Sequence, residues 1–289
     1  MTGAHRTLTP LEAAIDRTAN RVLARNPASG RRAVAIECAV FLLKQGWACI
    51  FGALLLLVIV AARLWYPDDA ALARNDALTI AAILIQIGML VCKLESGREL
   101  WVIVLFHLTG TAMELFKTDA GSWTYGAEGV LRIGAVPLFS GFMYAAVGSY
   151  MVRVYRLHDL RFSRYPPIWV TTVVATLIYV NFFAHHFIFD ARWILLGLVL
   201  LLWGRTIMYF RIWRVTLKVP VLVVFAGVAL VIWLAENIAT WAGAWLYPNQ
   251  EAGWELVSPQ KIIAWFLLMI ISVVMVTWVY RPRPPSDEA

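Results

Sequence analysis

The chain has 289 residues, of which 61% are apolar and 15% are charged, and its mean hydropathy is +0.71. Soluble globular domains are only about half apolar, so this composition excludes an ordinary soluble enzyme and predicts a membrane protein with several spans. The net charge of +7 does not indicate nucleic-acid binding, because the basic residues stand between apolar runs and do not form one surface.

Residues 1–45 are predicted to form a basic cytoplasmic arm. The sequence TPLE at residues 9–12 has the capping-box pattern, with proline at the first helical position. A short amphipathic helix is expected to follow, and its Arg17, Arg21 and Arg25 suit an anionic lipid surface. A loosely ordered tail is the alternative. We expect no removable signal peptide, because this segment lacks a short apolar core followed by a cleavage site.

The rest of the chain predicts an all-α fold of about eight transmembrane helices. They cover residues 46–65, 77–93, 99–117, 132–153, 167–189, 193–211, 219–241 and 259–280. The spans are expected to form two four-helix halves, the first at residues 46–153 and the second at 167–280. A cytoplasmic linker at 154–166 joins the halves, and a cytoplasmic tail follows at 281–289. Lys and Arg are concentrated in alternate loops. This pattern predicts a multi-pass membrane protein with both termini cytoplasmic.

One polar motif occurs twice. Residues Glu114–Tyr125 and Glu236–Tyr247 both read E-x6-G-x-W-x-Y, and the two copies lie 122 residues apart. Pro137 and Pro259 have the same spacing. An even number of predicted spans separates the copies, so they run in the same direction. The sequence therefore predicts two parallel four-helix repeats, related by a pseudo-twofold axis along the membrane normal.

Glu114 and Glu236 are predicted inside spans, where a carboxylate costs a few kcal/mol unless it faces protein, water or a partner. His107 and Thr111 share one helical face with Glu114, because the spacing is i, i+4, i+7. The other polar positions expected on inward faces are Asn237 of the seventh span, Tyr144 of the fourth, and Tyr179 and His186 of the fifth. Polar faces from four spans predict one interior cavity that opens outward.

These residue types suit proton transfer, because a buried acid can deliver a proton and a second carboxylate or a histidine can accept one. The candidate catalytic residues are Glu114, Glu236, His107 and His186. The candidate substrate-binding residues are Trp123, Tyr125, Trp245, Tyr247, Thr111, Asn237, Tyr144 and Tyr179. As alternatives, the motif aromatics would belong to an interfacial aromatic belt, and each histidine would serve only an interhelical hydrogen bond.

No metal site or cofactor is predicted. His185, His186 and Asp190 do not form a converging ligand set, because adjacent helical residues point in different directions. The three cysteines show no paired spacing, and Walker, Rossmann and G-x-S-x-G motifs are absent from the sequence.

Two stretches resemble a known family. They are KLESGRELWVIVLFHLTGTAMELFKTDAGSWTY at residues 93–125 and RIGAVPLFSGFMYAAVGSY at 132–150, and they are similar to the YoaT-like family of uncharacterised bacterial integral membrane proteins. The likeness extends over most of the chain from about residue 35. The resemblance implies a multi-pass protein of the bacterial cytoplasmic (inner) membrane, and it implies no activity.

A more distant resemblance is to membrane-embedded carotenoid hydratases and heterodimeric lycopene cyclases, which place a Glu before a Gly/aromatic stretch. The matching positions are Glu114, Gly121, Tyr125, Gly134 and Pro137, although the aromatic order at residues 121–125 differs. This likeness implies an isoprenoid substrate.

The leading hypothesis is therefore a membrane-embedded acid/base enzyme that acts on an apolar, isoprenoid-like lipid. Glu114 and Glu236 would protonate a double bond, and Trp123 and Trp245 would stabilise the carbocation. A proton-coupled transporter or small-molecule binder is the alternative, and a packing scaffold is a third. The expected partners are the lipid bilayer and an apolar molecule, with no nucleic acid; the oligomeric state stays open.

Overall fold

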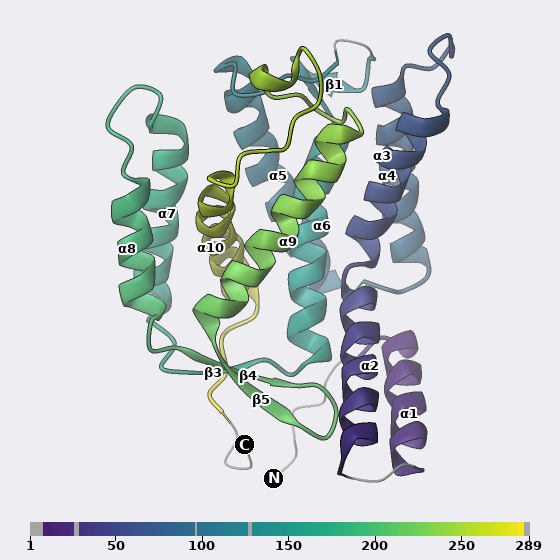
Figure 1. Cartoon of the computed structure of the whole chain (residues 1–289), viewed down its shortest axis with the longest axis vertical. Coiled ribbons are helices and arrows are strands. Elements are labelled where there is room, and N and C mark those ends of the chain that lie inside the picture. The colour runs from purple at the N-terminus through teal and green to yellow at the C-terminus, as the bar shows by residue number, and fades with distance from the viewer. Residues whose placement is uncertain (1–7, 26–28, 96, 127–128, 286–289) are drawn as a thin grey trace.

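The computed structural model describes residues 8–25, 29–95, 97–126 and 129–285, which are mostly helical. The helices are α1 (Pro10–Ala24), α2 (Arg31–Ala48), α3 (Ile50–Trp65), α4 (Arg74–Val91), α5 (Gly97–Asp119), α6 (Phe139–Leu157), α7 (Ile168–Ala184), α8 (Arg192–Trp203), α9 (Val221–Trp241) and α10 (Lys261–Val279). The short elements are β1 (Arg132–Ile133), β2 (Val136–Pro137), β3 (Arg161–Ser163), β4 (Ile207–Arg211), β5 (Thr216–Pro220) and the 3-10 turn η1 (Pro248–Gln250). Figure 1 shows α3–α10 as an elongated bundle, with α1, α2 and β3–β5 at its lower end.

The helices have the length and composition of a membrane protein. Among the described residues, α4, α5, α9 and α10 are long and apolar enough to cross a membrane. The pair α2 and α3, bent by 65°, supplies a fifth candidate span. Helices α7 and α8 are apolar but shorter, with 17 and 12 residues. Four to five candidate spans therefore stand where eight were predicted.

Exposed tryptophans mark both ends of the bundle. Trp65 at the end of α3 and Trp193 at the start of α8 lie at the upper end, and they are 76% and 64% exposed. Trp101 and Trp169, in the first turns of α5 and α7, lie toward the lower end and are both 72% exposed. Indole rings prefer the headgroup depth of a bilayer, so these positions agree with a membrane-spanning bundle.

The prediction of an all-α chain is wrong at the lower end of the bundle. Strand β4 pairs antiparallel with both β3 and β5, so the predicted span 193–211 is helical only as far as Trp203. A Cβ on Gly204 would lie 2.6 Å from the carbonyl oxygen of Leu200, so the tight turn that ends α8 requires glycine. Residues 207–211 carry isoleucine, tyrosine and phenylalanine, which favour a strand.

The predicted spans 132–153 and 167–189 are each longer than the helix that the structure shows there. Residues 132–137 form the β1–β2 hairpin, with Gly134 at φ +58° in its turn, and α6 begins only at Phe139. Helix α7 ends at Ala184, so residues 185–189 of the predicted span 167–189 lie outside the helix.

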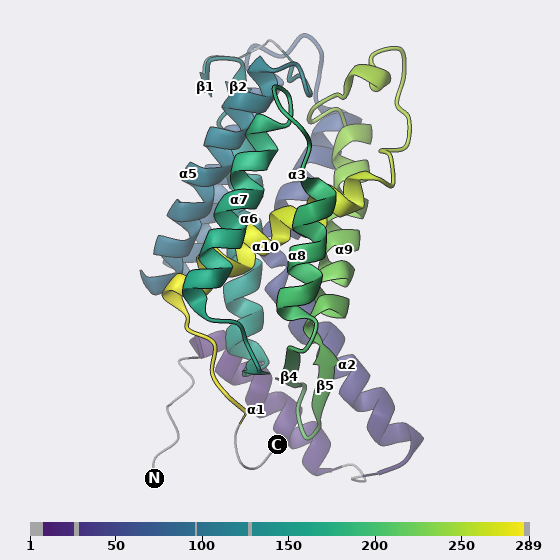
Figure 2. The same ribbon diagram turned by 90° about the vertical axis from the view of Figure 1, so that its left-hand side faces the viewer.

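Segments from near both ends of the chain lie at the same end of the bundle. The carbonyl oxygen of Arg283 accepts a hydrogen bond from the backbone N–H of Phe162 in β3, at 2.8 Å. Glu12 of α1 binds Arg156 in the last turn of α6. Figure 2 shows α1 and the β4–β5 hairpin together at that end.

Helices α5 and α9 end in the same way, 122 residues apart. After α5, Gly121 has φ +69° and its N–H donates to the carbonyl oxygen of Thr118 at 3.1 Å. After α9, Gly243 has φ +68° and its N–H donates to Thr240 at 2.9 Å. A left-handed glycine that follows the last helical turn satisfies carbonyl groups that would otherwise lack partners. Both copies of the motif therefore begin their loop with equal geometry.

Candidate functional site

Glu114 of α5 is held by three aromatic donors. Its Oε2 accepts hydrogen bonds from Trp123 Nε1 at 2.8 Å and from the Tyr125 hydroxyl at 2.7 Å. Its Oε1 accepts from the Tyr144 hydroxyl of α6 at 2.7 Å. Glu114 is buried, and this set of donors compensates for the lost hydration of its carboxylate. The structure brings four of the predicted site residues together here.

Glu236 of α9 has a similar environment. Its Oε1 accepts from the Tyr247 hydroxyl at 2.5 Å, and its Oε2 accepts from Trp265 Nε1 of α10 at 2.7 Å. The Tyr125–Glu114 and Tyr247–Glu236 bonds both join a tyrosine to the glutamate eleven positions earlier. The repeated motif therefore specifies the same Tyr–Glu contact twice.

Glu114 with its three donors and Glu236 with its two donors form two carboxylate clusters. The clusters contact each other through aromatic rings. The rings of Trp123 and Tyr247 meet edge to face, with centroids 6.1 Å apart. Lys261 Nζ lies 3.8 Å from the centroid of the Tyr247 ring. Trp123 and Tyr247 are only 9% and 7% exposed, so the aromatic-belt alternative does not hold for them. Trp245 is half-buried among apolar side chains.

A narrow groove of about 40 Å³ lies between α5, α6, α9 and α10. Tyr144 and Trp265, which donate to Glu114 and Glu236, both line it. Most of the other lining residues are apolar, including Phe106, Met113 and Leu268. Thr109 and Ser272 add two hydroxyl side chains to the lining. The groove is thus mostly apolar, and two of its lining side chains, Tyr144 and Trp265, are hydrogen-bonded to buried carboxylates.

Gly110 allows Tyr144 to reach this position. A Cβ on Gly110 would lie 2.3 Å from Cγ of the Tyr144 ring, so only glycine leaves room for the ring. Gly110 stands one turn before Glu114 on α5, and the absent side chain lets the phenol lie along the helix toward the carboxylate.

The two motif tyrosines remain protonated donors. Burial raises the pKa of the Tyr125 hydroxyl well above its ordinary value, and the charge of Glu114 raises it further. Burial and Glu236 raise the pKa of Tyr247 in the same way. Each phenol therefore keeps its proton at neutral pH and donates to its glutamate.

His107 and Thr111 face α6 and pack beside Gly141. The His107 ring meets Phe142 edge to face, with centroids 4.4 Å apart. A Cβ on Gly141 would lie 2.5 Å from His107 Nδ1 and 3.1 Å from Thr111 Oγ1. The structure therefore places both residues in a close helix–helix contact.

Asn237 and Tyr179 bind backbone groups. The Asn237 side chain accepts from Val257 N–H at 2.9 Å and donates to the Trp233 carbonyl at 2.8 Å, which fastens the loop before α10. The Tyr179 hydroxyl donates to the Thr109 carbonyl at 3.3 Å beside a second groove of about 200 Å³. The structure does not bring Tyr179 into either carboxylate cluster.

His186 contacts Lys117, a residue that the sequence interpretation missed. Lys117 Nζ lies 2.8 Å from His186 Nε2 and 3.4 Å from His185 Nε2. Lys117 is 3% exposed although it stands on an apolar helix. Among the residues that the structure describes, no three His, Cys, Asp or Glu side chains converge as a metal site.

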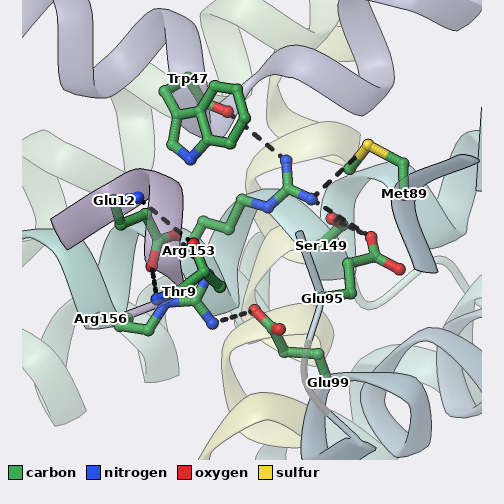
Figure 3. A network of polar contacts seen from close by, with 9 residues as sticks. All are labelled: Thr9, Glu12, Trp47, Met89, Glu95, Glu99, Ser149, Arg153 and Arg156. Carbon is green, nitrogen blue, oxygen red and sulfur yellow. Dashed lines mark hydrogen bonds and ion pairs between the residues drawn. The ribbon is translucent and has the colours of Figure 1, made fainter. Parts of the chain in front are cut away.

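A network of polar contacts joins α1, α5 and α6 (Figure 3). Arg153 of α6 is fully buried and contacts Glu95 at 3.4 Å. Arg156, one turn further, contacts Glu12 of α1 at 2.5 Å and Glu99 of α5 at 2.6 Å. Burial raises the pKa of the Glu95 carboxyl, whereas Ser149 and Arg153 lower it. The pair between Arg156 and Glu12 fastens α1 to the bundle.

The capping box at the start of α1 is confirmed and belongs to the same network. The backbone N–H of Thr9 donates to Glu12 Oε2 at 2.8 Å, and the backbone N–H of Glu12 donates to Thr9 Oγ1 at 3.4 Å. Glu12 thus uses one oxygen for the cap and the other for Arg156, as Figure 3 shows.

Comparison with known proteins assigns the chain to a family. Residues 37–273 match the family model described as "Protein of unknown function (DUF817)". The chain is 40% identical over 243 residues to "Uncharacterized protein YoaT" of Bacillus subtilis (strain 168). The matched region covers 84% of this chain and 91% of that relative. No solved structure matches. The predicted resemblance to YoaT-like proteins is confirmed, and the chain belongs to the family of proteins of unknown function DUF817.

Proposed function

We propose that the protein is a membrane-embedded acid/base enzyme that acts on a double bond of an apolar, isoprenoid-like lipid. One observation carries the proposal: Tyr144 and Trp265 line a single apolar groove and donate hydrogen bonds to the buried Glu114 and Glu236. Polar groups inside an apolar bundle are costly, and such groups in membrane proteins commonly mark functional sites.

Tyr144 is the candidate proton relay. When Glu114 is protonated, its hydrogen bond with Tyr144 reverses, so that the carboxyl donates to the phenol oxygen and the phenol O–H turns toward the groove. Glu114 then passes its proton to the Tyr144 oxygen while the phenol proton moves to a substrate carbon. The substrate becomes a carbocation, and the negative charge left on Glu114 and the face of Trp265 stabilise it. Loss of a proton from a neighbouring carbon to the same relay returns Glu114 to its acid form. The net reaction is migration of the double bond.

The membrane topology is part of the proposal. Eight spans would arise if α6, α7 and α8 also cross, with both termini in the cytoplasm of a bacterial cell whose inner membrane holds the protein. The exposed tryptophans at both ends support a bundle that spans the membrane, and the arginines near β3–β5 support this orientation. The equal helix ends and equal Tyr–Glu bonds, 122 residues apart, support two parallel repeats.

A proton-coupled carrier is the second candidate. The paired environments of Glu114 and Glu236 favour it, because carriers built from parallel repeats place polar residues where the repeats meet. A carrier would move its ligand unchanged, whereas the proposed enzyme changes the position of a double bond.

The deciding experiment is lipid mass spectrometry with resolution of double-bond positions. Membranes with equal amounts of wild type, Glu114→Gln, Tyr144→Phe or the exposed control Glu251→Gln would be compared. We expect a lipid isomer that forms with wild type and with the control but not with the other two variants. Equal isomer profiles in all four membranes would reject the enzyme, and ligand-dependent proton movement in vesicles would then favour the carrier.

A further inference from the structure

We propose that Lys117 and Lys261 bind the anionic head group of a single-chain amphiphile whose apolar chain lies in the groove. The inference rests on the proposed function, because it names the substrate class of the same site: an oxyanion head group on an apolar chain. Helix register, the surroundings of each lysine and the local charges support it.

The lysines continue the two helical stripes that line the groove. On α5, Gly110 and Met113 line the groove, and Lys117 follows Met113 at i+4. On α10, Lys261 precedes the lining residue Trp265 by four positions. Residues at i and i+4 share a helical face, so each lysine stands one turn, about 5.4 Å, beyond the lining residue. Helix α5 ends at the upper end of the bundle and α10 begins lower, beneath the loop that follows α9. The two lysines are near enough for the charge of Lys261 to act on Lys117.

Lys117 is a buried cation without a carboxylate contact among the described residues. Its Nζ lies 2.8 Å from His186 Nε2, and it stands 4.2 Å from the centroid of the Phe182 ring. Nδ1 of His185 lies 3.0 Å from the Asn181 carbonyl, which leaves Nε2 of that ring as an acceptor toward Lys117. Two imidazole rings and a phenyl ring surround this ammonium, and none of them supplies a negative charge that would neutralise it.

Lys261 is held in a comparable way by aromatic rings. Its Nζ lies 3.8 Å from the centroid of Tyr247 and 5.9 Å from that of Trp123. Within the described ranges, no ion pair or hydrogen bond to an acceptor is found for this ammonium. Its three N–H donors remain available to an incoming oxyanion.

The surrounding charges favour an anion. The positive charges of Lys261 and Arg192 both act on Lys117. Two carboxylates also lie within range, Asp190 and Glu236. Asp190 is already paired with Arg192 at 2.6 Å, and the oxygens of Glu236 accept from Tyr247 and Trp265. Two cations, Lys261 and Arg192, and one carboxylate, Asp190, thus act on Lys117. An oxyanion between the lysines would lower their mutual repulsion.

A matched set of ligands tests whether binding requires both the anionic head group and the apolar chain. Purified protein would be titrated with dodecyl phosphate, dodecanol or inorganic phosphate, and bound ligand would be counted by native mass spectrometry. We expect dodecyl phosphate to bind at least about tenfold more tightly than either partial ligand, since a hydrogen bond to a charged group contributes about one to two tenfold steps. Equal binding of dodecanol would reduce the site to an apolar groove. Equal binding of inorganic phosphate would reduce it to an ion site, and either result overturns the proposal.

The lysine variants assign the head-group contact. Lys117→Met/Lys261→Met keeps the length of both side chains, and we expect it to lose at least about tenfold in dodecyl phosphate affinity. Lys117→Arg/Lys261→Arg should retain binding, which guards against a variant that merely misfolds. The control is Lys218→Met, an exposed lysine on β5 at the other end of the bundle. Unchanged binding in the Met variant, or an equal loss in the control, would contradict the assignment.

Binding and catalysis separate in Glu114→Gln. We expect this variant to bind dodecyl phosphate as wild type does and to form no lipid isomer. Isomer formation that persists in Lys117→Met/Lys261→Met would overturn the head-group site and leave the acid/base function standing. If the wild type binds dodecyl phosphate but forms no lipid isomer, the acid/base function is overturned and the head-group site stands.

Discussion

Thr124 and Leu246 exchange two backbone hydrogen bonds, each 2.9 Å long, and so pair the loop after α5 with the loop after α9. Each residue occupies the position between Trp and Tyr in its copy of the repeated motif. Such a reciprocal pair has local twofold symmetry. The repeated motif thus joins its own two copies, and it brings Glu114 and Glu236 toward one groove.

This pairing predicts a specific cross-link. In an antiparallel pair that exchanges both hydrogen bonds the Cα atoms are about 5.5 Å apart, which suits a disulfide. Thr124→Cys/Leu246→Cys, in a chain whose native cysteines are replaced by serine, should therefore form a disulfide on mild oxidation. A protease site inserted between β4 and β5 would then leave two fragments that stay linked on a non-reducing gel. Thr124→Cys alone is the control, and fragments that separate in the double variant would refute the pairing.

The buried tyrosines predict a loss of stability at alkaline pH. Because the folded-state pKa values of Tyr125 and Tyr247 lie well above the ordinary value of about 10, their stabilising effect is complete below that pH. It is lost as the pH rises above about 10, where the unfolded tyrosines ionise first. Thermal unfolding followed across that range should show a shallower decline for Tyr125→Phe than for wild type. A decline of equal steepness would argue that Tyr125 is not enclosed as described.

Gly110→Ala should displace Tyr144 from Glu114. The added methyl would collide with the Tyr144 ring, and overpacking of this kind costs about 1–3 kcal/mol. The matched control is Gly227→Ala on α9, where a Cβ has nothing within 4 Å and better helix propensity adds about 0.5–1 kcal/mol. Denaturation of both purified variants would measure the difference. A Gly110→Ala protein as stable as the control would exclude this close packing.

Glu12→Gln should loosen α1. The substitution weakens the contact with Arg156, although Glu99 still balances that charge, so we expect a loss of about 1–3 kcal/mol. Limited proteolysis within α1 should become faster, whereas the exposed control Arg17→Gln should be cut at the wild-type rate. Equal rates for Glu12→Gln and wild type would show that α1 is held by other contacts.

Periodic and repeated features were predictable from the sequence. The carboxylates, the motif aromatics and Tyr144 could be identified because they combine polar groups with apolar helices or recur at a fixed spacing. Trp265 was missed because the position 122 residues after Tyr144 is Phe266, and the actual donor to Glu236 is its neighbour. A repeat predicts which helix supplies a donor more reliably than which residue does.

Contacts between distant charged residues were not predictable. The structure pairs Glu95 and Glu99 with Arg153 and Arg156 of α6. Nothing in their spacing marks those partners, because they depend on how α5 and α6 pack. Strand β4 was missed because its apolar composition also suits a helix end, and hydropathy does not separate the two.

The contact between Glu12 and Arg156 spans 144 residues, and this separation has a consequence for biogenesis. Helix α1 leaves the ribosome before any helix of the bundle, yet its buried carboxylate has to wait for α6 before it meets its counter-ion. Helix α1 can contact α2 earlier, through Asp16 and Lys44, but its ion pair with Arg156 forms late during synthesis. Formation of that ion pair would report that the first half of the bundle has assembled.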